Sequence, residues 1–144
     1  MTRLMISAAL IAAVALPALA EGITLTDGYA RAAAPTAKAG AAFLTLENTS
    51  GQDDRLIGVA SEAAARVQLH THQETDGVMR MVHVEEGFAL PAGETLTMER
   101  GGAHVMLMGL TTPLDSGAEV TITLTFEQAG DVVVTVPVDL ARTE

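Results

Sequence analysis

Residues 120–127 read Val-Thr-Ile-Thr-Leu-Thr-Phe-Glu, a strict alternation of apolar and polar side chains. Successive side chains of a β-strand point to opposite faces, so this stretch predicts a strand with one buried face. Residues 128–131 predict a turn, and residues 132–138 predict the returning strand. Pro137 has no backbone N–H to donate, which favours an edge strand or a strand end at that position. The C-terminal part of the chain therefore indicates an all-β fold.

The sequence before residue 120 contains further short segments that predict strands. A strand is predicted from Ile23, and Asp76-Gly77 predicts a tight hairpin turn. The alanine-rich residues 30–42 are expected to form a loop, and the helix-like residues 61–65 are too few for a stable helix. Many short strands at even spacing predict a single-domain β-sandwich or small barrel with Greek-key connections. The other predicted strands cover residues 41–47, 54–60, 66–72 and 78–84.

Residues 1–20 have the three-part pattern of a secretory signal peptide. Arg3 is followed by an apolar run over residues 4–16 and by the small-x-small sequence Ala18-Leu19-Ala20. The alternative, a membrane-spanning helix, is less well supported because the run is shorter than the roughly 20 residues that cross a bilayer. We therefore expect a mature domain of residues 21–144 in the periplasm, with no membrane anchor after cleavage.

Composition excludes several classes of function. The chain has 18 acidic and 8 basic residues and a net charge of −10, so it repels the phosphate backbones of nucleic acids and anionic membranes. It has no cysteine, and hence no disulfide and no thiolate ligand. A blue-copper electron-transfer site is disfavoured because that site needs a cysteine thiolate. Any metal site must use histidine, methionine, carboxylate or backbone groups.

The histidines and methionines of the expected mature domain lie in one short region. All four histidines are at positions 70, 72, 83 and 104, and the methionines are at 79, 81, 98, 106 and 108. On the predicted strands these side chains occupy one face and aliphatic side chains the other. Thioether sulfur is a soft donor that suits Cu(I) and gives little to Zn(II), Mg(II) or Ca(II). The pattern predicts Cu(I) ligands at His70, Met81, His104 and Met106.

The other donors are interpreted differently. Met98 stands apart from the pattern and is expected to fill the core. Met79, Met108, His72 and His83 are expected to support the site or to lie on the surface.

Four segments resemble the periplasmic copper chaperone family PCuAC. They are Leu69-His70-Thr71, Gly77-Val78-Met79-Arg80-Met81, Pro91-Ala92-Gly93 and residues 101–110, Gly-Gly-Ala-His-Val-Met-Leu-Met-Gly-Leu. The family pattern is His, ten residues, Met, twenty-one residues and His-x-Met. Here ten residues separate His70 from Met81 and twenty-two separate Met81 from His104. We expect the extra residue in a turn at Glu85-Glu86-Gly87.

The resemblance implies a cupredoxin-like β-barrel that binds Cu(I) through His70, Met81, His104 and Met106. It also implies delivery of copper to the CuA centre of cytochrome c oxidase, alongside Sco-type proteins. A copper carrier is therefore the favoured interpretation, and no enzyme activity is expected.

Three alternatives to a copper carrier remain. A copper enzyme, such as a dismutase or oxidase, needs a metal that cycles between oxidation states, whereas thioethers favour the reduced ion. A copper storage or resistance protein uses the same donors. A structural sandwich without metal leaves the clustering of histidine and methionine unexplained.

Overall fold

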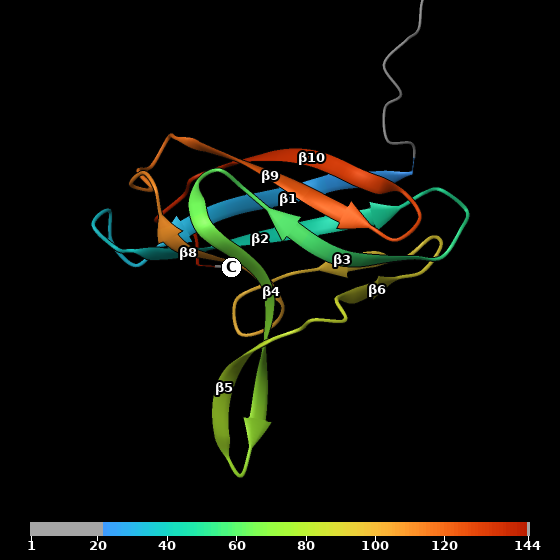
Figure 1. Ribbon diagram of the computed structural model, residues 1–144, viewed down its shortest axis with the longest axis horizontal. Coiled ribbons are helices and arrows are strands. Elements are labelled where there is room, and N and C mark those ends of the chain that lie inside the picture. The colour runs from blue at the N-terminus through green and yellow to red at the C-terminus, as the bar shows by residue number, and fades with distance from the viewer. Residues whose placement is uncertain (1–21, 144) are drawn as a thin grey trace, which may run out of the picture.

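The computed structural model describes residues 22–143, which form two antiparallel β-sheets packed face to face (Figure 1). Within that range all regular secondary structure is β-strand. No helix among these residues is long and apolar enough to cross a membrane. The expected signal peptide and Glu21 lie outside the described residues. The predicted all-β sandwich is confirmed.

The first sheet carries the histidine and methionine residues. Its order is β1-β2-β8-β4-β5, and β7 pairs with β2 beyond the end of β8. Because β8 lies between β2 and β4, a strand from late in the chain separates two strands from its first half. The bounds are β1 (Ile23–Ala32), β2 (Ala39–Asn48), β4 (Ala64–Thr75), β5 (Val78–His83), β7 (Thr95–Thr97) and β8 (His104–Leu110).

The second sheet covers the inner face of the first. Its order is β10-β9-β3-β6. Pro137 is the last residue of the edge strand β10, as the sequence predicts. The bounds are β3 (Asp54–Ala60), β6 (Phe88–Leu90), β9 (Glu119–Phe126) and β10 (Gly130–Pro137).

The predicted strands are all present, with one correction and two additions. The loop expected over residues 30–42 is shorter, because β1 continues to Ala32 and β2 begins at Ala39. Ala30 and Ala32 are buried, so these small side chains pack in the core of the sandwich. Residues 61–65 form no helix: residues 62 and 63 are a turn, and β4 begins at Ala64. The three-residue strands β6 and β7 were not predicted from the sequence.

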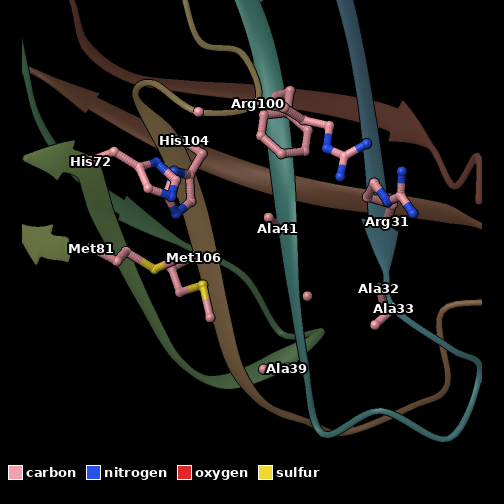
Figure 2. Close-up of a pocket in the computed structure, with 13 residues that line it drawn as sticks. Arg31, Ala32, Ala33, Ala39, Ala41, His72, Met81, Arg100, His104 and Met106 are labelled. Atoms are coloured by element: carbon pink, nitrogen blue, oxygen red, sulfur yellow. The ribbon is translucent and has the colours of Figure 1, made fainter. Parts of the chain in front are cut away.

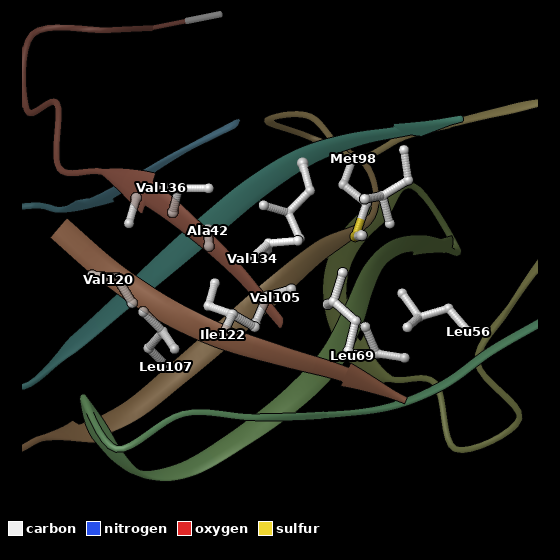
Figure 3. Packing of buried hydrophobic residues seen from close by; sticks show 14 of the residues in the cluster. Ala42, Leu56, Leu69, Met98, Val105, Leu107, Val120, Ile122, Val134 and Val136 are labelled. Atoms are coloured by element: carbon white, nitrogen blue, oxygen red, sulfur yellow. The ribbon is translucent and has the colours of Figure 1, made fainter. Parts of the chain in front are cut away.

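The core lies between the sheets (Figure 3). The alternating residues of β9, Val120, Ile122, Leu124 and Phe126, are all buried, which confirms the predicted face. Burying each such side chain contributes roughly 1.5–3 kcal/mol. Met98 is 2% exposed and belongs to this core, as expected.

The β4–β5 hairpin projects beyond the second sheet and forms the narrow end of the molecule (Figure 1). Its turn is Asp76-Gly77, and both residues have positive φ, 53° and 77°. Two-residue hairpin turns of this kind match the right-handed twist of the flanking strands, and glycine adopts positive φ without strain. β5 is the edge strand of the first sheet, so Met79 and Met81 on it are exposed.

Candidate metal centre

The strand register brings the predicted donors to one face of the first sheet. His70 of β4 lies opposite His104 of β8 on one side and His83 of β5 on the other. His72 lies opposite Met81. Directly opposed residues in antiparallel strands project to the same face. The imidazole and thioether side chains therefore share the outer face. The opposed pairs on the inner face are Leu69 with Val105 and Val67 with Leu107.

The four imidazole rings form a continuous group across three strands. The ring centroids of His72 and His104 are 5.5 Å apart, and those of His104 and His70 are 5.9 Å apart. The ring of His83 is 5.7 Å from that of His70. Phe43 of β2 lies against the other side of His104, with a centroid distance of 6.1 Å.

Hydrogen bonds fix which nitrogen has a free lone pair in the rings of His104 and His70. The Nδ1–H of His104 donates to the carbonyl oxygen of Gly102 at 3.1 Å, which leaves Nε2 unprotonated in the neutral ring. The Nε2–H of His70 donates to Oε1 of Gln68 at 3.0 Å, which leaves Nδ1 unprotonated. His72 also contacts the Gly102 carbonyl through Nδ1, at 3.3 Å. Metal-binding histidines commonly donate their other N–H in this way.

Two of these lone pairs are buried and unused. Within residues 22–143, the buried side-chain polar atoms without a hydrogen-bond partner are the hydroxyl of Tyr29, Nδ1 of His70 and Nε2 of His104. A buried polar atom without a partner is costly and rare in folded proteins. The two unpartnered nitrogens belong to the two histidines that the sequence predicts as ligands.

The surroundings favour neutral imidazole at both positions. Burial lowers the pKa of His70, and the positive charges of His104 and His83 lower it further. Burial also lowers the pKa of His104, with a smaller contribution from the charge of His72, while the hydrogen bond to Gly102 acts in the opposite direction. Only neutral imidazole coordinates a metal ion, so these shifts keep both side chains ready to bind.

An open pocket of about 430 Å³ lies over this face (Figure 2). His72, His104, Met81 and Met106 form one wall, with the two rings side by side and the two sulfur atoms close below them. The structure thus brings three of the four predicted ligands to one pocket. His70 does not line it, and its ring lies beside His104 in the neighbouring position.

The donors at this pocket are nitrogen and thioether sulfur. Among residues 22–143, no three side chains drawn from histidine, cysteine, aspartate and glutamate form a group that could hold a metal ion. The donors around the pocket are instead imidazoles combined with Met81 and Met106, a set whose softness suits Cu(I).

Three pocket residues with polar or charged side chains were not assigned to the site from the sequence. His72 was expected only to support it, although its i+2 spacing from His70 places both on one face. Arg31 of β1 and Arg100 of the loop before β8 form the wall opposite the sulfur atoms. No sequence pattern indicates these arginines, because they approach the donors only through the order of the strands.

Comparison with known proteins identifies relatives of this chain. It matches the family described as LpqE-like over residues 23–138. A protein of Leifsonia xyli subsp. xyli (strain CTCB07), named as a lipoprotein, is 36% identical over 119 residues, which cover 83% of this chain and 70% of that protein. A protein of Rickettsia prowazekii (strain Madrid E) is 28% identical over 98 residues, which cover 68% of this chain and 54% of that protein.

Solved structures of PCuAC domains have the same fold. The copper-bound PCuAC domain from PmoF2 aligns with a TM-score of 0.66 and 27% identity, and the alignment covers 83% of this chain and 93% of that domain. The Cu(I)-bound DR1885 protein of Deinococcus radiodurans aligns with a TM-score of 0.62 and 35% identity, covering 86% of this chain and 84% of that one. The apo form of DR1885 is 32% identical and covers 97% of both chains, with a TM-score of 0.62. The predicted cupredoxin-like fold and the resemblance to PCuAC domains are confirmed.

Proposed function

The chain belongs to the LpqE-like family, and we propose that it is a Cu(I) carrier that binds one ion through its histidine and methionine face and passes it to a partner. The observation that carries the proposal is the pair of buried, unpartnered nitrogens of His70 and His104, together with the pocket that His104 shares with the thioethers of Met81 and Met106. The copper-bound relatives support the choice of metal.

The proposed ligands are Nδ1 of His70, Nε2 of His104 and the sulfur atoms of Met81 and Met106. Thioethers are neutral ligands, so a partner that offers thiolates can extract the ion. The site offers no thiol that an oxidising compartment would convert to a disulfide. These properties suit a binding module that exchanges its cargo.

The proposed location rests on the sequence of residues 1–20, and the proposed partner rests on the resemblance to PCuAC proteins. Removal of residues 1–20 would release a periplasmic protein that begins at Glu21, which mass spectrometry of the exported protein would test. The resemblance to PCuAC proteins supports the CuA centre of cytochrome c oxidase as the recipient, together with a Sco-type protein.

Anaerobic titration against a Cu(I) chelator tests the binding. We expect one Cu(I) per chain, held more tightly than about 1 μM. X-ray absorption of the loaded protein should report both sulfur and nitrogen scatterers. Weaker binding, or a site without sulfur, would refute the proposal.

His70→Ala and His72→Ala are the matched variants for the ligand set, because both side chains lie on the same face of β4 and only His72 lines the pocket. The proposed ligands predict that His70→Ala weakens Cu(I) binding more than His72→Ala does. The reverse order would move the site to His72 and leave the carrier function intact.

A further inference from the structure

The pocket is larger than a copper ion requires. Its volume of about 430 Å³ exceeds by far the roughly 30 Å³ that one water molecule occupies in the liquid. The imidazoles and thioethers account for one wall. The opposite wall is built by Arg31 and Arg100, which lie across β2 from the sulfur atoms (Figure 2).

Small side chains on β2 keep the space between the two walls open. Arg31 lies opposite Ala41, and Ala41 lies opposite Met106, so these three residues form one row across β1, β2 and β8. With strands about 4.8 Å apart, the backbones of Arg31 and Met106 are about 10 Å from each other. Ala41 fills little of that distance, and Ala39 continues the same shallow floor. The trough has room for a small molecule or a side chain.

Arg31 and Arg100 carry positive charge, and no acidic side chain among residues 22–143 forms an ion pair with either of them. The ion pair recorded in that range joins Arg142 to Asp27. Arg31 donates through Nη1 to the carbonyl oxygen of Arg142 at 2.7 Å, and Arg100 donates through Nη1 to that of Thr143 at 3.4 Å. Both acceptors are neutral, and a guanidinium has five N–H groups.

Two guanidinium groups beside a site for a monovalent cation oppose the binding of the bare ion. They favour an occupant that brings negative charge with it. In a protein with a net charge of −10, this local positive charge is the exception. Guanidinium groups suit carboxylates, which accept two parallel hydrogen bonds from one arginine.

Building on the proposed Cu(I) site, we propose that Arg31 and Arg100 form a subsite for a carboxylate on the ligand that gives copper to this protein or removes it. The soft donor of that ligand reaches the copper beside Met81 and Met106 while its carboxylate lies against the arginines. In removal by a thiol, a copper–thiolate bond replaces a copper–thioether bond and the thiol proton goes to solvent. Copper remains Cu(I), so no electron is transferred.

A pair of thiols that differ only in the carboxylate tests the subsite. Cu(I)-loaded protein is titrated with 3-mercaptopropionate and, separately, with 3-mercapto-1-propanol, and the thiol concentration that removes half of the copper is measured. The ratio of the two concentrations isolates the contribution of the carboxylate. The double variant Arg31→Gln, Arg100→Gln should shift this ratio against the carboxylate by roughly tenfold, and added salt should shrink the preference of the wild type.

Arg66→Gln is the matched control. Arg66 is exposed on the face of β4 that carries His70 and His72, but it does not line the pocket. It should keep the wild-type ratio. The exposed Arg100→Gln alone should give part of the shift, which covers the case in which the double variant does not fold. An N-acetylated Cys-Glu amide compared with its Cys-Gln counterpart shows whether a peptide reaches the subsite or only a small chelator does.

Equal ratios in the wild type and the arginine variants would overturn the subsite while leaving the copper carrier intact. A wild-type protein that binds no Cu(I) would overturn the proposed function and the subsite together. Loss of the carboxylate preference in Arg66→Gln as well would assign the effect to general surface charge and also overturn the subsite.

Discussion

Met106 and Met98 provide a pair of identical substitutions, one at the proposed metal site and one in the core. Met106 is half-buried on the outer face of β8 and lines the pocket. Met98 is 2% exposed and lies between the two sheets, in the same core cluster as Leu69 and Leu56 (Figure 3). Replacement by leucine roughly conserves the volume at each position and removes the sulfur atom.

The two variants should have opposite effects on copper binding and on stability. Met106→Leu removes one of four proposed donors, so we expect Cu(I) affinity to fall by about tenfold or more, which corresponds to at least 1.4 kcal/mol. Its unfolding free energy should change by only about 0.5 kcal/mol, because the side chain lies on the outer face. Met98→Leu should cost up to about 1.5 kcal/mol of stability and leave Cu(I) affinity unchanged.

Two measurements give the comparison. Anaerobic competition with a Cu(I) chelator reports the affinity, and urea unfolding of the metal-free protein reports the stability. Unchanged affinity in Met106→Leu would show that Met106 is not a ligand. An equal loss of affinity in Met98→Leu would show that altered packing, rather than a missing donor, controls binding.

Three further predictions concern the metal-free fold, each measured by urea unfolding. Burial lowers the pKa values of His70 and His104 in the folded protein, so the unfolded chain takes up protons first as the pH falls. The unfolding free energy should therefore be at its full value above about pH 6.5 and should decrease below it. An unfolding free energy that rises on acidification would contradict this. Asp54→Ala leaves three backbone N–H groups without their acceptor and should cost about 3 kcal/mol or more, with Asp54→Asn costing less; a loss below about 1 kcal/mol would refute the role of the carboxylate. Gly87→Ala places a Cβ against the carbonyl oxygen of Leu56 at a φ of +70° and should cost about 1–3 kcal/mol, whereas Gly93→Ala has the same strain without the overlap and should cost less.

The clearest strand prediction is the one whose apolar and polar side chains alternate strictly. Residues 120–126 have one face buried against the other sheet, and that burial requires the alternation. β6 and β7 have three residues each, too few for any period to be visible. The loop boundaries near Ala32 and Ala39 were missed because alanine carries little strand preference, and only the contact between the sheets decides its conformation.

For the proposed metal site, the sequence predicts which side chains share a face of each strand. It does not predict which residues of neighbouring strands lie opposite one another. The i+2 spacing places His70 and His72 on one face, and the register alone sets His70 opposite His104 and His72 opposite Met81. The strand order, with β8 between β2 and β4, also brings Arg31 to the pocket. Pairing between strands distant in sequence depends on the packing of the whole sandwich, which local patterns do not encode.

The two kinds of donor at this site differ in how firmly the fold holds them. His104 is 2% exposed, lies against Phe43 and donates Nδ1–H to Gly102, so the position of its ring is fixed before any metal binds. Met81 is 46% exposed on an edge strand of the projecting hairpin. A carrier needs one donor that orients the ion and others that an incoming ligand can displace. The alternation of each strand separates these donors from the core, so the exposed thioether of Met81 can be exchanged without disturbing the packing that holds His104 in place.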